Sequence, residues 1–148
     1  MAKLAIKINE TDFNKPHFTF FCINTTLNDY HFCWALNEML SLNFARIENI
    51  SLNETSSQSF SVFQDRNTNP ELIYSLLSIK SDNGLLMKDL AGFDFLLCVD
   101  GQIDTTKVKQ MQSTISTIKN VLLITRLENK KTKPSTIADL SYLMEMIG

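Results

Sequence analysis

The chain has 148 residues, of which 44% are hydrophobic and 20% are charged, and its formal net charge is -2. A chain of this length can bury a large core, so we expect one globular domain over residues 1–148. The small net charge gives no sign of a nucleic-acid partner. No stretch approaches the roughly 20 apolar residues of a membrane span, so we expect no membrane partner either.

The three cysteines are far apart in the sequence, and each lies among apolar neighbours: Cys22, Cys33 and Cys98. This pattern is typical of reduced, buried thiols rather than of a disulfide framework. Residues 1–9 lack the apolar run of a secretory signal. Together these features predict a cytoplasmic protein.

The first part of the chain is predicted to form an arm, a strand and a helix. Residues 1–17 are mixed and polar, so we expect a loose arm or an edge strand. The apolar run 18–23 predicts a buried strand. Thr26 and Asp29 have the spacing of a capping box, which predicts a helix that runs to about residue 42 and ends at Asn43.

The middle of the chain is predicted to be mainly strand. Residues 59–64 and 71–80 read as a β-hairpin, because the segment between them is dense in turn-forming residues. The run 81–84 ends in Asn-Gly and predicts a second turn. Residues 93–99 form the clearest central strand. The pattern of residues 44–58 is too weak to assign.

The last part of the chain is predicted to contain two helices and a strand. Apolar residues at helical spacing predict a helix over residues 104–118, and the run 121–125 predicts a buried strand. Residues 129–148 are interpreted as a basic linker and a C-terminal amphipathic helix, with a capping box at Thr136 and Asp139. Residues 104–148 hold seven basic and four acidic residues, an excess that we interpret as a solvated tail and strand end.

The order of elements predicts an α+β fold. Hairpins make neighbouring strands antiparallel, and each helix has one apolar stripe to bury. We therefore expect a two-layer sandwich with a mostly antiparallel sheet of about five strands and helices packed on one face. A ferredoxin-like core would fit this order.

Two segments resemble a known family. The segment Met87-Lys88-Asp89-Leu90-Ala91-Gly92-Phe93-Asp94-Phe95 resembles the signature that names the IPExxxVDY family of small bacterial proteins, and Asp94 is identical to the aspartate of that signature. The helix that begins at Leu27 is similar to the first helix of that family. The resemblance covers about residues 18–127. It implies an intracellular protein of Bacteroidetes type and no catalytic or binding residues.

The first helix carries aromatic residues on two sides. Phe32, Cys33, Leu36, Met39 and Leu40 form the apolar stripe expected to face the core. Four other side chains lie outside this stripe and are our candidate partner-binding surface: Tyr30, Trp34, Asn37 and Ser41. Either another part of the chain covers the two aromatic rings, or they anchor a protein partner. The terminal helix could likewise cover its own sheet or dock on a second subunit.

One carboxylate stands out in the central strand. Asp94 shares a strand face with Leu96 and Cys98, so its burial requires a hydrogen bond or an ion pair. It could bind backbone amides or a lysine, or it could orient a small ligand in a pocket.

Motifs for phosphate, dinucleotide, zinc or nucleophilic-serine sites are missing from the sequence. His31 and Cys33 are two positions apart on a helix and therefore cannot face each other. We thus expect no cofactor, no metal and no catalytic residues. The leading hypothesis is a non-enzymatic module for protein–protein contact that includes self-association, for example as a homodimer. A small-ligand sensor with its pocket between sheet and helices is the alternative, and an enzyme is the third possibility.

Overall fold

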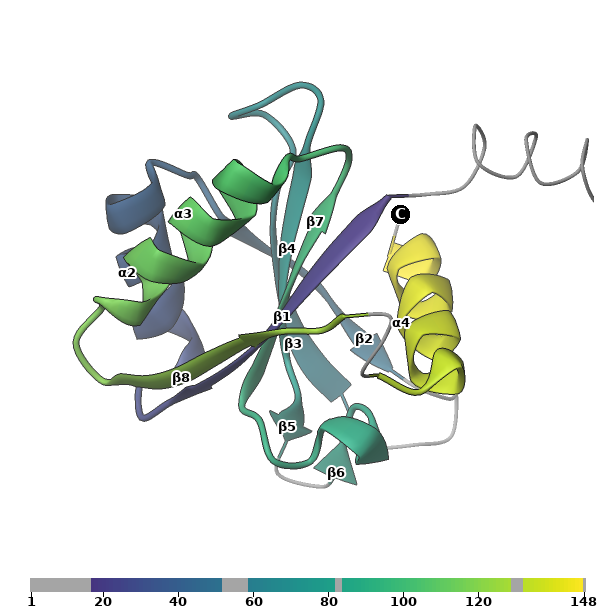
Figure 1. Cartoon of the computed structure of the whole chain (residues 1–148). Helices are drawn as coiled ribbons and strands as arrows, with labels where there is room; N and C mark the ends of the chain where they lie inside the picture. The colour runs from purple at the N-terminus through teal and green to yellow at the C-terminus, as the bar shows by residue number, and fades with distance from the viewer. Residues whose placement is uncertain (1–16, 52–58, 82–83, 129–131, 148) are drawn as a thin grey trace, which may run out of the picture.

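The computed structural model describes residues 17–51, 59–81, 84–128 and 132–147, which form a large sheet with helices on both sides (Figure 1). The elements in chain order are β1 (Phe18–Thr25), α2 (Asp29–Leu40), β2 (Ala45–Ser51), β3 (Ser59–Asp65), β4 (Ile73–Ser78), β5 (Lys80–Ser81), β6 (Gly84–Leu85), the 3₁₀ helix η1 (Lys88–Leu90), β7 (Phe95–Asp100), α3 (Thr105–Ser116), β8 (Val121–Arg126) and α4 (Pro134–Ile147).

The large sheet has six strands in the order β2-β3-β4-β7-β1-β8, and every neighbouring pair is antiparallel. The elements β1, α2, β4, β7, α3 and β8 follow the strand and helix order of a ferredoxin-like core. Strands β2 and β3 extend the sheet beyond β4. The predicted α+β class with an antiparallel sheet is confirmed, with six strands in place of about five.

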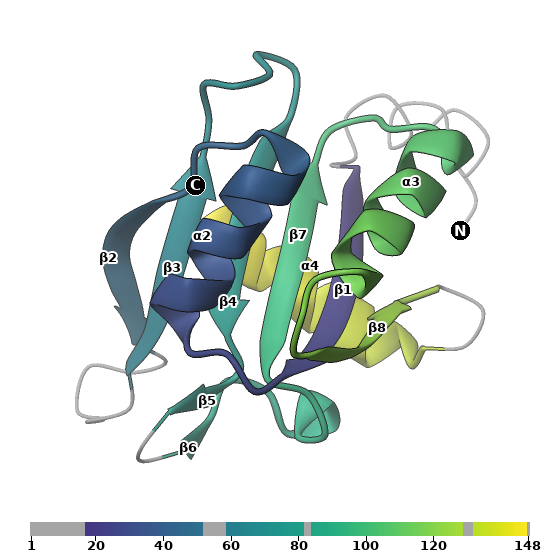
Figure 2. The ribbon, with the colours of Figure 1, turned by 90° about the vertical axis from the view of Figure 1, so that its left-hand side faces the viewer.

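Helices cover both faces of the sheet (Figure 2). Helices α2 and α3 lie on one face and pack on the side chains of Phe95, Leu97 and Val99, whereas α4 packs on the opposite face with Leu96 and Cys98. Side chains alternate along a strand, so β7 is apolar on both faces because both are covered. The sequence predicted helices on one face, and α4 differs because its stripe covers the second face of its own sheet.

The observed helix ends differ from the predicted caps. The side chain of Asn28 accepts a hydrogen bond from the His31 amide at 2.9 Å and so begins α2, which makes the predicted capping box wrong. Ser41, with φ 54°, is the left-handed cap instead of Asn43. Helix α4 begins at Pro134, a residue suited to a first turn, so Thr136 is already inside the helix.

Several predicted segments fall outside the described residues: all of the N-terminal arm except His17, the tip of the turn at 81–84, and residues 129–131 of the basic linker. Strand β2 was not predicted, because it alternates weakly and most of its side chains are exposed.

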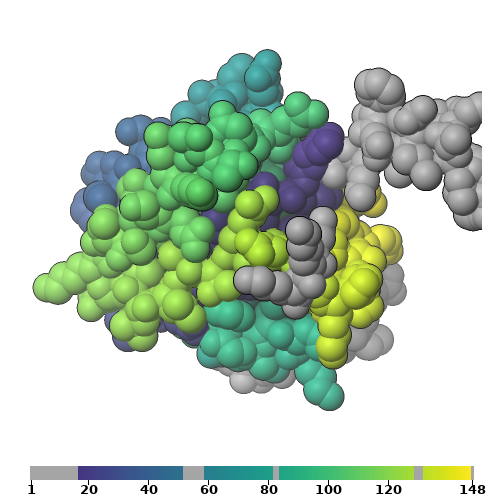
Figure 3. Space-filling model, viewed as in Figure 1, coloured from purple at the N-terminus to yellow at the C-terminus, as the bar shows by residue number. Residues whose placement is uncertain are grey.

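Strands β2 and β8 form the two edges of the sheet. In the space-filling view, β8 (yellow-green) lies at the surface between α3 (green) and α4 (yellow) (Figure 3). Within the described part of the chain, no helix has the length and apolar character needed to cross a membrane.

Candidate functional site

The outer face of α2 presents the two aromatic side chains that the sequence singled out. Trp34 is 65% exposed and Tyr30 is 60% exposed, whereas Phe32, Cys33 and Leu36 are buried in the core. The rotational phase predicted for this helix therefore agrees with the structure for these residues. Met39 is an exception, because it was placed in the buried stripe but is 47% exposed.

Tyr30 is exposed but firmly held. Its ring meets the ring of Phe63 edge-on, with a centroid distance of 5.7 Å. The guanidinium of Arg46 donates a hydrogen bond to the Tyr30 hydroxyl at 2.9 Å and lies 5.6 Å from the ring centroid. These contacts fix the ring before any partner arrives, which lowers the entropy that binding would cost.

Asn37 and Ser41 shape the end of α2. The Asn37 side chain accepts a hydrogen bond from the Phe44 amide at 2.7 Å and donates one to the Phe44 carbonyl at 3.3 Å. Ser41 donates its backbone N–H to the Asn37 carbonyl. The amide of Asn37 is therefore engaged within the chain, and the exposed surface centres on Trp34 and Tyr30.

Sequence reasoning missed Arg46, which lies on β2 and completes this surface. Arg46 and Tyr30 are 16 residues apart, a separation that corresponds to no sequence motif. Only the position of β2 in the folded sheet brings Arg46 to α2. We define the α2 surface as Tyr30, Trp34 and Arg46.

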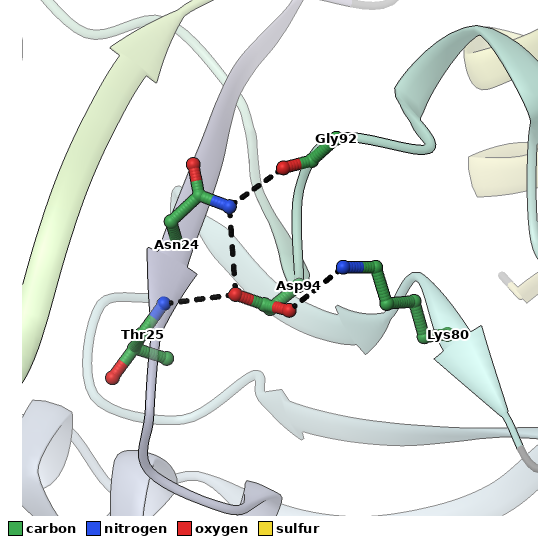
Figure 4. A network of polar contacts seen from close by, with 5 residues as sticks. All are labelled: Asn24, Thr25, Lys80, Gly92 and Asp94. Atoms are coloured by element: carbon green, nitrogen blue, oxygen red, sulfur yellow. Dashed lines mark hydrogen bonds and ion pairs between the residues drawn. The ribbon is translucent and has the colours of Figure 1, made fainter.

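Asp94 binds groups from two other elements (Figure 4). One carboxylate oxygen accepts a hydrogen bond from the Thr25 amide at 3.0 Å, and the other lies 3.1 Å from the Lys80 ammonium. Asn24 also approaches the carboxylate, at 3.5 Å, and donates to the Gly92 carbonyl at 2.6 Å. Asp94 therefore connects the end of β1 to the start of β7 and to β5.

We expect Asp94→Ala to lower the free energy of unfolding by about 1 to 3 kcal/mol, because the Thr25 amide would lose its acceptor. Lys80→Met should cost less than about 1 kcal/mol, since the Lys80 side chain is 47% exposed and its ion pair is solvent-screened. Urea denaturation of both variants would measure the difference. Equal losses would show that the ion pair, rather than the backbone contact, is the stabilising interaction.

The thiols are poorly suited to nucleophilic chemistry. Burial raises the pKa of Cys22 to about 12, and burial together with the nearby Asp29 carboxylate raises the pKa of Cys33 to about 11. Burial also raises the pKa of Cys98 well above its usual value. These thiols stay protonated near neutral pH, whereas nucleophilic attack requires a thiolate. Among the residues that the structure describes, no group of three His, Cys, Asp or Glu side chains could hold a metal ion.

The segment with the resemblance to the family signature has a structural role. It forms η1, where Leu90 is buried in the core beneath α4. The carboxylate of Asp89 accepts a hydrogen bond from the hydroxyl of Thr136 at 2.6 Å, and Thr136 is buried. The segment thus fixes the first turn of α4 against the sheet.

A shallow groove that the sequence did not predict runs between α3 and the edge strand β8. It consists of two adjoining hollows of about 330 and 420 Å³. Lys109, Gln112 and Ile124 line both hollows. Tyr30, Trp34 and Asp94 line neither, so the groove is separate from the predicted sites.

No protein-family model matches the chain, and no curated protein matches it. The resemblance to the IPExxxVDY family therefore stays a prediction from the signature segment.

Proposed function

We propose that the protein is a non-enzymatic protein-interaction module whose α2 surface docks on a second copy of the same chain. The observation that carries the proposal is the 65% exposure of Trp34 on a well-capped helix. Tryptophan and tyrosine are enriched among the residues that dominate binding energy at interfaces. An indole ring left in water is therefore a natural anchor.

The surroundings of Trp34 support a protein partner. Tyr30 lies one helical turn from Trp34 and is held by Phe63 and Arg46. Two exposed aromatic rings with an arginine beside them have the composition of an interface core. An isologous contact would use this surface twice, so each copy would supply the same anchor.

A small-ligand sensor is supported less well. Both carboxylate oxygens of Asp94 already have partners within the chain. A ligand would have to displace the Thr25 amide or the Lys80 ammonium to reach this carboxylate.

We expect Trp34→Ala to weaken self-association at least about tenfold, the loss typical of an interface anchor. Sedimentation velocity over a range of protein concentrations would measure it. The variant should keep its thermal stability, because the side chain is mostly in water.

Tyr142→Ala is the matched control, since Tyr142 is 66% exposed on α4, on the opposite face of the molecule. This variant should associate like the unmodified protein. Identical sedimentation of the Trp34→Ala variant and the unmodified protein would contradict the proposed docking surface.

A further inference from the structure

The open edge of β8 carries backbone groups directed away from the sheet. Leu127 donates its amide to the Phe20 carbonyl of β1 at 2.9 Å. Backbone groups alternate in direction along an antiparallel strand, so the amide and carbonyl groups of Ile124 and Arg126 face the open side. Strand β8 pairs with β1 without interruption from Leu123 to Arg126, after a register shift between Val121 and Leu123.

A side chain occupies part of this edge. The amide of Gln112 on α3 donates a hydrogen bond to the Ile124 carbonyl at 3.3 Å. This carbonyl is the acceptor that the N–H of a further strand would use. The Gln112 side chain can rotate away from Ile124. The contact therefore protects the edge strand but does not prevent another strand from pairing with it.

The other edge of the sheet is less suited to an added strand. Pairing between β2 and β3 is interrupted between Ile47 and Ile50. Arg46 and Glu48 also lie within β2, and charged side chains on an edge strand discourage pairing with another chain. The longer uninterrupted run of paired residues at an edge is therefore in β8.

The groove beside β8 combines apolar and basic side chains. Leu122 is 70% exposed and Leu123 is 51% exposed, and both line the groove. Lys109 and Arg126 line it from its two sides, and neither forms an ion pair with any described residue. Glu128 lies at one end of the same groove. The basic side chains lie beside the groove, so an acidic partner suits it better than a basic one.

We propose that β8 and the groove along α3 bind an extended acidic peptide segment of another protein, which adds to the sheet as a further strand (Figure 3). Backbone hydrogen bonds to Ile124 and Arg126 give affinity, and the exposed leucines receive alternate apolar side chains of the peptide. Lys109 and Arg126 select carboxylates on the incoming strand. This surface is distinct from the α2 surface, and the inference does not depend on self-association.

The test uses the whole chain and short fluorescent peptides in which valine alternates with glutamate or with lysine. We expect the glutamate peptide to bind at least about tenfold more tightly than the lysine peptide and to lose affinity in high salt. Binding should shift the amide resonances of Ile124 and Arg126. Equal affinity for the two peptides, or no shift at β8, would overturn the proposal.

Two variants separate charge from backbone pairing. Arg126→Ala removes the charge and keeps the outward N–H, so we expect a loss of about threefold to fivefold. Arg126→Pro also removes that N–H and should lose about tenfold or more, while Leu127 keeps its bond to β1. A glutamate peptide methylated on its backbone nitrogens should bind the unmodified protein weakly, which tests pairing without changing the fold.

A second copy is the competing occupant of this edge. Concentration-dependent association that Arg126→Pro abolishes and Trp34→Ala leaves intact would replace the acidic peptide by a β8–β8 contact and would overturn the proposal. Loss of association only in Trp34→Ala would instead support self-association through the α2 surface. The peptide measurements would then decide whether the β8 edge binds an acidic strand.

Discussion

Gly101→Ala should lower the free energy of unfolding by about 2 to 5 kcal/mol. Gly101 has φ +136°, a backbone conformation that residues with a side chain rarely adopt. A Cβ atom there would lie 2.5 Å from the Glu71 carbonyl oxygen and 2.6 Å from the Leu72 side chain. The carbonyl belongs to the backbone and cannot rotate away, so the end of β7 would have to shift.

Thermal and urea denaturation would measure this loss. For a chain of this size, each 1 kcal/mol lowers Tm by about 2 to 4 °C. Gly92→Ala is the matched control, because an added Cβ at Gly92 would meet no atom within 4 Å. We expect less than about 0.5 kcal/mol there. Similar losses in the two variants would show that the close approach to Glu71 is not the cause.

Asp65→Asn should lower the free energy of unfolding by about 2 to 3 kcal/mol at neutral pH. A buried carboxylate that accepts hydrogen bonds from several backbone N–H groups would be replaced by a neutral side-chain amide. Asp65 accepts backbone hydrogen bonds from Asn43 at 2.9 Å and from Asn67 and Thr68 at 3.0 Å. It therefore joins the start of β2 to the turn between β3 and β4.

The effect of Asp65→Asn should depend on pH. Burial alone would raise the pKa of Asp65, but the hydrogen bonds from Thr68, Asn43 and Asn67 outweigh it and hold the pKa below its usual value. The stabilisation is fully present above the pKa of an unfolded aspartate, about 3.9. It is lost as the pH falls through the lower pKa of the folded state.

The stability difference between the unmodified protein and Asp65→Asn should therefore be constant near neutral pH and shrink in acid. Denaturation curves at a series of pH values would measure it. Asp104→Asn is the control, because Asp104 caps α3 through the Lys107 amide at 2.7 Å and asparagine caps a helix equally well. A difference for Asp65→Asn that persists unchanged into strong acid would contradict the role of its carboxylate.

The sequence predicted the central elements well because their patterns are strong. The apolar runs of β1 and β7 and the stripes of α2 and α3 lie where they were expected. The run 121–125 does form a strand, β8, but the prediction that it is buried is wrong, because β8 is an edge strand with Leu122 and Leu123 exposed. An apolar stripe predicts that one side of a helix is buried, but it does not predict which surface the helix packs on. The sheet face that α4 covers could therefore not be predicted. Asn28 was passed over as the cap of α2 because Thr26 and Asp29 offered a competing local pattern.

The candidate site was predictable only where local spacing decides exposure. The position of Tyr30 and Trp34 outside the buried stripe follows from the helical period, but whether another element covers them does not. The contact of Arg46 with Tyr30 depends on how β2 pairs with β3, and the partners of Asp94 come from residues 14 and 69 positions away. The groove beside β8 depends on the order of the strands in the sheet. The patterns of the individual strands and helices do not predict that order.

The first described strand, β1, lies between β7 and β8 in the sheet, so both of its partners are synthesised well after it. Phe18 faces Asp100, and Phe21 faces both Leu97 and Arg126. On a growing chain the phenylalanines of β1 must wait for these partners, while the β2–β3–β4 meander can form early. Such distant pairing makes folding slow, and it leaves incomplete chains with an unpaired, aggregation-prone strand.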